Sequence, residues 1–133
     1  MTNLHQAIGQ LILGKVAATE LEPENRELLR AGTMSGITLF RDNAEQLHQL
    51  VKLVDDVRSS CAVRAIVTVD QEGGAVQRFD RVLSPLPSMM ALGALPSADR
   101  AFEIAKISGE QLALIGVDVV LAPVLDVNTN RSN

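Results

Sequence analysis

The chain has 133 residues and a formal net charge of −4, and 47% of its residues are hydrophobic and 21% charged. This balance is typical of one globular domain with enough apolar side chains to form a core. Three phenylalanines are the only aromatic residues, so the chain lacks the stacking rings and the basic face of nucleic-acid-binding proteins, and we expect no nucleic-acid partner.

The sequence also argues against a membrane protein and against a disulfide-stabilised one. No segment approaches the ~18 apolar residues of a membrane-spanning helix. The N-terminus has neither a basic stretch nor a long apolar one of the kind that forms a signal peptide. Cys61 is the only cysteine, so it has no partner for an internal disulfide or a metal pair, and we expect it to be a semi-buried structural side chain. We therefore expect a cytoplasmic protein without a membrane partner.

Short helices and strands alternate in the first third of the chain. A helix is expected near Leu4 to Gly9, and the apolar run 11–14 is a candidate strand. A proline suits the first turn of a helix over 23–30, and Gly32 can terminate it. The apolar run 36–40 is too short for a helix and is expected to form a strand.

The middle of the chain predicts a longer helix followed by a strand. Asn43 can cap a helix that begins at Ala44, with Gln46 placed to complete a capping box. Apolar residues then recur at helical spacing on one face. The run 65–69 is β-branched without polar alternation, as in strands buried on both faces.

The last third repeats the pattern after a longer connection. Three prolines punctuate a loop over 80–96, and Ser97 can cap a helix that Gly116 stops. The apolar run 117–121 follows as another strand. Strand, capped helix and strand at this spacing form βαβ units, so we expect an α/β fold with about four parallel strands and intervening helices.

Parallel α/β architecture indicates where a functional site lies. Ligands bind at the carboxyl ends of the strands, in the loops that lead into the helices. Three loops of this chain qualify, at residues 41–43, 70–80 and 123–133.

The second of these loops carries the strongest chemical pattern. Asp70 follows a strand directly, Gly73 and Gly74 allow a sharp turn, and Arg78 comes eight residues after Asp70. A carboxylate can accept hydrogen bonds from two neighbouring hydroxyls, and a guanidinium donates in a planar fork. These groups are suited to binding a sugar.

The same residues allow three other interpretations. A glycine-rich loop after a strand can bind phosphate, but no phosphate-loop pattern is present and Asp70 and Glu72 would repel an anion. Asp70 and Glu72 could bind a hard metal ion, although no third ligand is near in sequence. Asp70 and Arg78 could also form an ion pair that only holds the loop.

Four motifs in fixed order resemble one family of enzymes. The residues 70–79, DQEGGAVQRF, resemble the signature loop of the β-N-acetylhexosaminidases of glycoside hydrolase family 3. The segments GITLFRDN, LPS and LAPVLDVN resemble the family's second strand, the loop after the signature, and its fourth-strand segment. Together they extend over nearly the whole chain.

The resemblance implies roles for particular residues. Asp70 and Arg78 match the family positions that bind the sugar at the cleaved linkage. Glu72 and Asp126 are candidates for supporting the pocket. Ala75 stands where family members often have arginine, a position better suited to supporting the loop than to chemistry.

The resemblance also implies that this chain is the N-terminal half of a larger catalytic domain. Family members form a (β/α)₈ barrel, a fold of ~250 residues, so residues 1–133 supply about half of it. The aspartate nucleophile, the histidine loop that serves as acid and base, and a Lys-His substrate motif are expected beyond Asn133. His5 and His48 do not replace them, Arg131 does not match a substrate arginine, and we expect no catalytic residue, metal or cofactor within these residues.

The implied activity is the retaining hydrolysis of terminal β-linked N-acetylglucosamine from cell-wall muropeptide fragments, by the whole enzyme and not by these 133 residues alone. A family 3 β-glucosidase or β-xylosidase is the alternative within the family. A non-catalytic sugar-binding or assembly module is the alternative outside it. An open half-barrel exposes two sheet edges and an apolar inner face, so we expect the isolated chain to self-associate.

Overall fold

Four parallel strands form the central sheet of the computed structural model, which describes residues 4–127 and 129. Their order across the sheet follows the chain: β1 (Leu13–Lys15), β2 (Gly36–Leu39), β3 (Ile66–Val69) and β6 (Val119–Val120). The helical segments are α1 (Leu4–Gly9), α2 (Pro23–Ala31), the 3₁₀ turn η1 (Arg41–Asn43), α3 (Leu47–Ser60), α4 (Met89–Gly93) and α5 (Ala98–Ile115). A separate antiparallel hairpin consists of β4 (Gln71–Gly73) and β5 (Val76–Gln77). The expected parallel α/β fold is confirmed.

Two helices begin and end where their local signals predict. Pro23 occupies the first turn of α2, and Gly32 ends that helix in the left-handed conformation, at φ 70°. The Ser97 hydroxyl at the start of α5 accepts a hydrogen bond from the Asp99 N–H, at 3.1 Å. Gly116 ends α5 in the same left-handed way, at φ 99°. Both predictions are confirmed because caps act within a few residues of the chain.

The expected start of α3 is wrong. The helix begins at Leu47, with Gln46 as the residue before its first turn and Gln49 completing the capping interaction. Asn43 instead is buried beside the strand ends, where its Nδ2 donates to the carbonyls of Val16 and Ala18 at 3.0 and 2.7 Å. The atom that a helix cap would require, Asn43 Oδ1, instead accepts a hydrogen bond from the Phe40 N–H at 2.7 Å.

Three further differences concern short elements. The loop expected over 80–96 contains α4, whose N-terminus is capped by the Ser88 hydroxyl. The glycine-rich loop contains the β4–β5 hairpin. The expected strands 11–14 and 117–121 are Leu13–Lys15 and Val119–Val120. Asn128 and Arg131, which the sequence analysis considered, lie outside the described residues.

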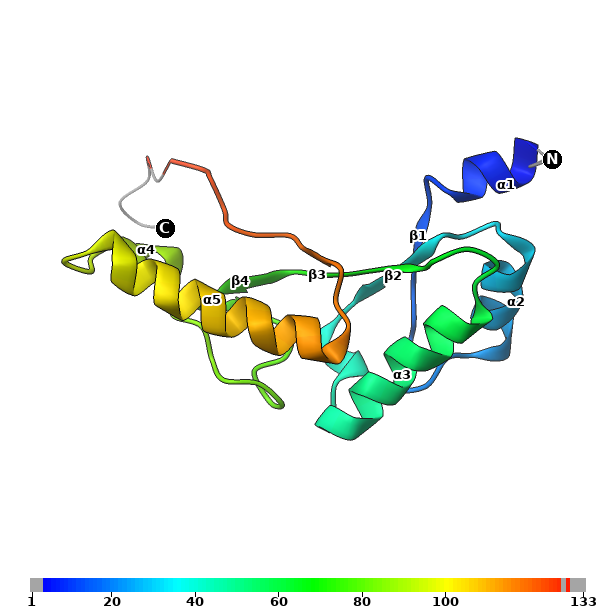
Figure 1. The fold of residues 1–133 in the computed structure, drawn as a ribbon, viewed down its shortest axis with the longest axis horizontal. Helices are drawn as coiled ribbons and strands as arrows, with labels where there is room; N and C mark the ends of the chain where they lie inside the picture. The colour runs from blue at the N-terminus through cyan, green and yellow to red at the C-terminus, as the bar shows by residue number, and fades with distance from the viewer. Residues whose placement is uncertain (1–3, 128, 130–133) are drawn as a thin grey trace.

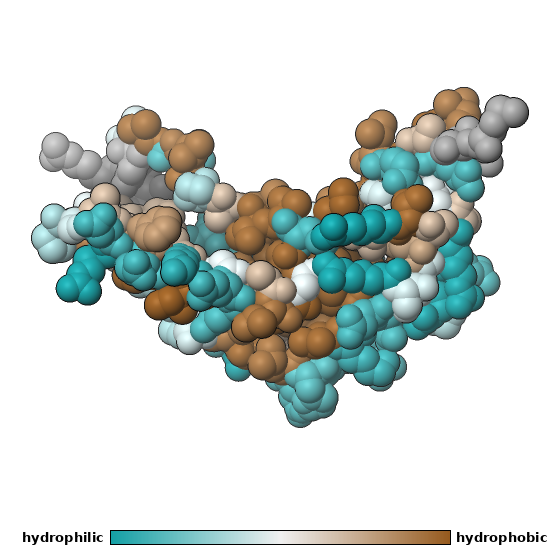
Figure 2. Space-filling view, in the orientation of Figure 1, coloured by the Kyte–Doolittle hydropathy of each residue, from teal (hydrophilic) through white to brown (hydrophobic). Residues whose placement is uncertain are grey.

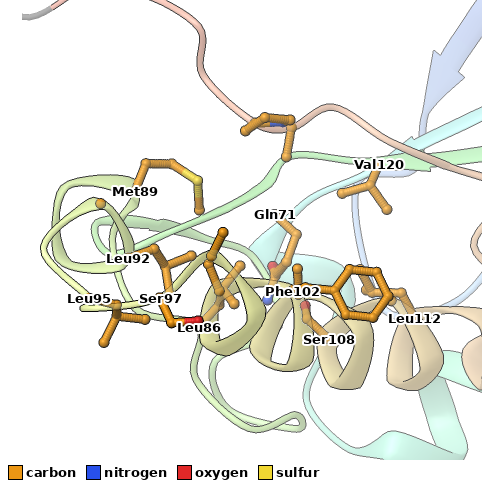
Figure 3. A pocket seen from close by; sticks show the side chains of 17 residues that line it. Gln71, Leu86, Met89, Leu92, Leu95, Ser97, Phe102, Ser108, Leu112 and Val120 are labelled. Atoms are coloured by element: carbon orange, nitrogen blue, oxygen red, sulfur yellow. The ribbon is translucent and has the colours of Figure 1, made fainter.

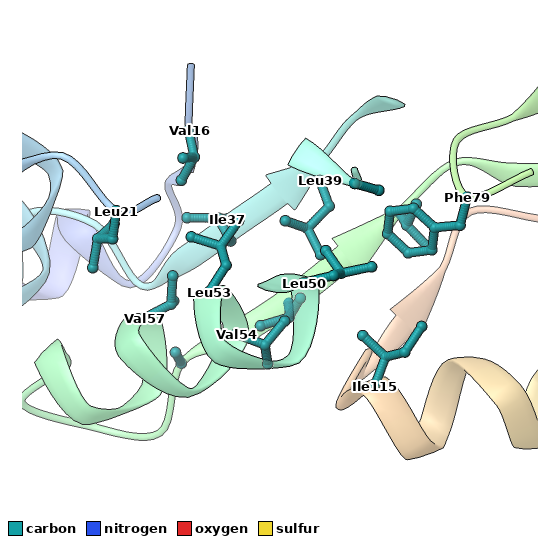
Figure 4. Packing of buried hydrophobic residues seen from close by; sticks show 14 of the residues in the cluster. Val16, Leu21, Ile37, Leu39, Leu50, Leu53, Val54, Val57, Phe79 and Ile115 are labelled. Atoms are coloured by element: carbon teal, nitrogen blue, oxygen red, sulfur yellow. The ribbon is translucent and has the colours of Figure 1, made fainter. Parts of the chain in front are cut away.

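The core lies between the sheet and the helices along one of its sides. Ile37 and Leu39 of β2 point toward α3, as Figure 4 shows, and both are fully buried. Val67 and Val69, at the same positions of β3, are also inaccessible to solvent. The α3 residues that complete this layer are Leu50, Leu53, Val54 and Val57. Burial of a side chain of this size stabilises a fold by about 1.5–3 kcal/mol.

The opposite face of the sheet is largely uncovered. Successive side chains of a strand point to opposite faces, so Leu13, Ile66 and Val119 lie on this second face, and they are 41%, 41% and 42% exposed. In Figure 1, α3 and α5 lie below the strands, and the space above them is open between α1 and the C-terminal segment. Figure 2 shows apolar side chains along this open side. The carboxyl ends of β1, β2 and β3 share one edge of this face, and they position the candidate site.

No helix among residues 4–127 and 129 is long and apolar enough to cross a membrane.

Candidate functional site

Asp70 and Arg78 meet at the carboxyl end of β3. Asp70 directly follows the strand, and the β4–β5 hairpin turns the chain so that Arg78 Nη2 lies 2.9 Å from Asp70 Oδ2. The two side chains are 26% and 30% exposed, so the pair is accessible from the open side of the sheet. The other carboxylate oxygen, Asp70 Oδ1, accepts no hydrogen bond from the described residues. The ion pair that the sequence analysis considered as an alternative is therefore present. It leaves Asp70 Oδ1 able to accept a hydrogen bond from a ligand.

A tight turn in the hairpin brings the two side chains together. Gly73 adopts φ 92°, and a Cβ at this position would collide with the Pro87 carbonyl oxygen. Gly74 follows at φ 59°, and its N–H donates to the Leu86 carbonyl at 3.0 Å. A side chain at position 73 would therefore be strained and would displace the segment that packs beside it.

Two buried glutamines hold the backbone that carries Arg78. Gln71 Oε1 accepts hydrogen bonds from the N–H groups of Arg78 and Phe79, at 2.8 and 3.3 Å. Gln77 Nε2 donates to the Gly74 carbonyl at 2.9 Å, and Gln77 Oε1 accepts from Leu86 N–H at 2.6 Å. Because buried amides without partners are costly, these bonds fix the hairpin and with it the base of the Arg78 side chain.

An aromatic ring supports the arginine from the neighbouring strand. Phe40 follows β2, and the Arg78 guanidinium carbon lies 5.6 Å from the centre of its ring. Lys15 Nζ, at the end of β1, lies 5.4 Å from the same centre. Both distances are within the range of a cation–π interaction. The Nε of Arg78 is buried and has no hydrogen-bond partner among the described residues, and the guanidinium group contacts the Phe40 ring and Asp70.

A second ion pair ties the hairpin to β2. Arg41 Nη1 lies 3.0 Å from Asp80 Oδ2, and Arg41 Nη2 donates to the Gln77 carbonyl at 2.9 Å. Arg41 therefore links the 3₁₀ turn after β2 to the last residue of β5 and to the loop that follows it. This second pair is partly exposed and contributes little to the free energy of unfolding, so its main effect is to position the hairpin.

The two candidate support residues do not join this cluster. Glu72 lies in β4 and is partly exposed, and Asp126 is exposed in the extended segment after β6. Neither forms a hydrogen bond or an ion pair with a described residue. Their supporting roles, like the contact of Asp70 and Arg78 with a sugar, stay predictions.

The residues that hold the pair were not predicted as site residues from the sequence. Phe40 and Arg41 were expected only as the end of a strand and the start of a loop, and Gln71 and Gln77 only as part of the motif. The available signal was position, because Phe40, Arg41 and Gln71 come at or directly after strand ends. His5 and His48 are both exposed, on α1 and α3.

An apolar pocket of about 680 Å³ lies elsewhere, between α4, α5 and β6 (Figure 3). Leu86, Met89, Leu92 and Phe102 are among the side chains that line it, and neither Asp70 nor Arg78 does. Of its polar lining residues, Gln71 has its side-chain oxygen engaged by Arg78 and Phe79. A sugar requires several hydrogen-bond partners, so we place the candidate sugar site at the Asp70–Arg78 pair.

The part of the chain that the structure describes offers no metal site to compare with the Asp70–Arg78 pair. No three His, Cys, Asp or Glu side chains there are grouped to hold an ion. The Asp70 carboxylate is engaged by an arginine instead. The pair places a hydrogen-bond acceptor and a donor side by side, a combination that can bind hydroxyl groups.

Comparisons with known proteins identify the family of the chain. The description of the family model that matches residues 3–133 is "Glycosyl hydrolase family 3 N terminal domain". A β-hexosaminidase of Haemophilus influenzae is 40% identical over 112 residues, which are 81% of this chain and 32% of the relative. A β-hexosaminidase of Idiomarina loihiensis is 36% identical over 117 residues, 85% of this chain and 36% of the relative.

Solved structures give the same result. A family 3 β-N-acetylglucosaminidase of Paenibacillus superposes with a TM-score of 0.91 at 34% identity, over 98% of this chain and 26% of the other. NagZ of Neisseria gonorrhoeae, in complex with N-trifluoroacetyl-D-glucosamine, has a TM-score of 0.80 at 31% identity, over 87% of this chain and 36% of the other. The expected fold class, part of the family's barrel, is confirmed. The chain spans about a third of the length of the curated relatives it matches, and it belongs to glycosyl hydrolase family 3.

Proposed function

We propose that the protein containing this chain is a retaining β-N-acetylhexosaminidase that removes terminal β-linked N-acetylglucosamine from cell-wall muropeptide fragments. The observation that carries the proposal is the Asp70–Arg78 pair, held at 2.9 Å and open to solvent at the end of β3. The family membership and the names of the relatives support the reaction class. The muropeptide substrate and the retaining mechanism come from the family resemblance.

In this proposal, Asp70 and Arg78 bind hydroxyl groups of the terminal sugar. Asp70 Oδ1 has no protein hydrogen bond within the described residues and can accept from a hydroxyl. Arg78 donates from the same side, with its position set by the Phe40 ring and by Gln71. Charge-assisted hydrogen bonds of this kind are worth about 1.5–3 kcal/mol each.

The 133 residues alone are proposed to lack turnover. Retaining hydrolysis requires a nucleophile and an acid–base group on either side of the bond. Asp70 and Asp80, the carboxylates of the cluster itself, are each paired with an arginine. A pair of this kind can orient a sugar but does not supply the attacking and protonating groups together.

The test uses the full-length gene product and the isolated 133-residue chain. Both are incubated with 4-nitrophenyl N-acetyl-β-glucosaminide and with 4-nitrophenyl β-glucoside, and nitrophenolate release is followed. The proposal expects the full-length protein to hydrolyse the N-acetylated substrate at least about tenfold better in kcat/KM, a difference of ~1.4 kcal/mol. It expects the isolated chain to release none.

Each other result supports a different function. Preference for the glucoside would indicate the β-glucosidase or β-xylosidase alternative. Binding of N-acetylglucosamine by the full-length product without any hydrolysis would indicate a non-catalytic sugar-binding module. Turnover by the isolated chain would contradict the expectation that these residues hold only the sugar contacts.

A further inference from the structure

Two residues at the short turn η1 contact the hairpin that carries Arg78. Phe40 directly precedes the turn, and its ring centre lies 5.6 Å from the Arg78 guanidinium carbon. Arg41 is the first residue of the turn, and its Nη2 donates to the Gln77 carbonyl at 2.9 Å. Because Gln77 directly precedes Arg78, the position of η1 affects both the guanidinium group and the backbone of Arg78.

Asn43, the last residue of η1, holds the turn together from within. Its Oδ1 accepts a hydrogen bond from the Phe40 N–H at 2.7 Å. Its own N–H donates to the Phe40 carbonyl at 3.0 Å. Both polar groups of the Phe40 backbone are therefore bonded to Asn43, which sets the direction in which the Phe40 ring and the adjacent Arg41 side chain leave the turn.

The same amide anchors η1 to the neighbouring loop, which joins β1 to α2. Asn43 Nδ2 donates to the carbonyls of Val16 and Ala18, at 3.0 and 2.7 Å. A side-chain amide has two N–H donors and one carbonyl oxygen, and in Asn43 all of them are engaged. Asn43 has no exposed surface, so a shift of η1 against this loop would leave buried polar groups without partners, which is costly.

The contacts from η1 to the hairpin are made by side chains that can adapt. The Arg41 side chain is 42% exposed and that of Arg78 30%. Contacts between partly exposed charged groups are individually weak and do not by themselves impose one geometry. The buried, fully hydrogen-bonded Asn43 therefore provides the rigid base from which these contacts extend.

We propose that Asn43 is a positioning residue for sugar binding. By fixing η1 to the loop after β1, it directs the Phe40 ring and the Arg41 side chain at the hairpin and keeps Arg78 beside Asp70. Asn43 is fully buried and does not touch the sugar itself. The effect on catalysis rests on the proposed function, whereas the effect on the position of Arg78 does not.

The test compares two truncations of buried side chains in the full-length protein, Asn43→Ala and Val57→Ala. Val57 is a matched control because it is also fully buried, is apolar, and lies in the last turn of α3, away from η1. Hydrolysis of 4-nitrophenyl N-acetyl-β-glucosaminide and its inhibition by N-acetylglucosamine are measured at a temperature at which circular dichroism shows both variants to be folded.

Asn43→Ala is expected to lower kcat/KM about tenfold, because two contacts worth about threefold each lose their alignment. Most of the loss should be in KM, with a similar rise in the inhibition constant of N-acetylglucosamine, since Arg78 binds the sugar before as well as during the reaction. Phe40→Leu and Arg41→Met each remove one contact and should raise KM about threefold. Val57→Ala should lower the unfolding temperature and leave KM unchanged.

A spectroscopic readout tests the position of Arg78 without relying on hydrolysis. Ring currents of Phe40 shift the resonance of the Arg78 Nε–H, which NMR of protein labelled with ¹⁵N-arginine detects. The Nε is buried, and this slows the exchange of its proton with water. Phe40→Leu gives the resonance position without the ring. Asn43→Ala should move the resonance toward that position, and Val57→Ala should leave it in place.

An unmoved Arg78 resonance in Asn43→Ala would overturn the inference, and so would equal changes in KM for Asn43→Ala and Val57→Ala. If Asn43→Ala does not fold, Asn43→Ser replaces it, and an unchanged KM in both Phe40→Leu and Arg41→Met refutes the inference independently. If the full-length natural sequence does not hydrolyse the N-acetylated substrate, the proposed function fails, and the Arg78 resonance alone decides the role of Asn43.

Discussion

The two faces of the sheet differ sharply although the same four strands form both. On the helix-covered face, Ile37 and Val67 have no exposed surface. On the open face, Ile66 and Val119 keep about two-fifths of theirs, at 41% and 42%. Because apolar burial stabilises in proportion to the area removed from water, the covered face holds this part of the molecule together.

The open face carries polar and charged side chains and has no fully packed apolar layer. The edge of this face at the carboxyl ends of the strands carries Asp70, Phe40 and Lys15, which lie at the ends of three neighbouring strands. Within β3 and β2, the Thr68 hydroxyl donates to the Thr38 hydroxyl at 2.9 Å. The comparison indicates that one face is built for stability, and the other is built to be covered and to bind a ligand.

The largest expected effect is on stability and separates the two faces directly. Ile37→Ala should lower the free energy of unfolding of the isolated chain by about 2–5 kcal/mol, because it opens a cavity in the packed layer. Ile66→Ala, the same substitution on the open face, should cost less than about 1 kcal/mol. Urea unfolding of both variants measures the difference. Equal losses would refute the division between a covered and an open face.

Self-association provides the second test of the comparison. The isolated chain should associate through the open face, and Ile66→Lys should weaken that association roughly tenfold, or ~1.4 kcal/mol, because it places a charge among the exposed apolar side chains. Val63→Lys is the control, since Val63 is 51% exposed in the loop before β3. Sedimentation equilibrium measures both. A monomeric natural chain, or the same effect from both variants, would contradict the expectation.

A smaller effect is expected from the charge cluster that fastens β6 to the covered side. Partial burial acts to raise the pKa of Asp118, but hydrogen bonds from Val67 N–H, Arg64 and Arg58 outweigh it and hold that pKa below its ordinary value. A lowered folded-state pKa stabilises the protein above about pH 4, where the unfolded carboxyl is ionised, and this stability is lost as the pH falls through the folded-state pKa.

Asp118→Asn should therefore lower the free energy of unfolding at pH 7 and flatten its decline below about pH 4. Thermal unfolding followed by circular dichroism between pH 2.5 and pH 7 measures both effects. Asp55 of α3 is exposed and forms no ion pair with a described residue, so Asp55→Asn is the control. If the stability of Asp118→Asn declines below about pH 4 as that of the natural sequence does, the cluster does not contribute to stability.

Local signals were sufficient to predict much of the covered layer. A proline before α2, Gly32 after it, Ser97 before α5 and Gly116 after that helix set boundaries that depend on a few neighbouring residues. The start of α3 was not predictable in this way. Asn43 with Gln46 and Gln46 with Gln49 offer the same local pattern, and the buried carbonyls of Val16 and Ala18, distant in sequence, decide between them.

The candidate site was only partly predictable for the same reason. The motif identified Asp70 and Arg78, and the structure places them in contact. The contacts of the Phe40 ring with Arg78 and Lys15 depend on three strands being neighbours at one edge, which no local pattern records. Gln71 and Gln77 act through hydrogen bonds to backbone groups that the hairpin brings near.

The most direct test of the account is the effect of Asp70→Asn on hydrolysis of 4-nitrophenyl N-acetyl-β-glucosaminide by the full-length protein, with Asp55→Asn as the control. We predict a loss of about 100-fold in kcat/KM, since one or two charge-assisted hydrogen bonds to the sugar are removed. We also predict an unfolding temperature close to that of the natural sequence, because the Asp70–Arg78 pair is partly exposed. An unchanged kcat/KM would contradict the assignment of Asp70 and Arg78 as the residues that hold the sugar.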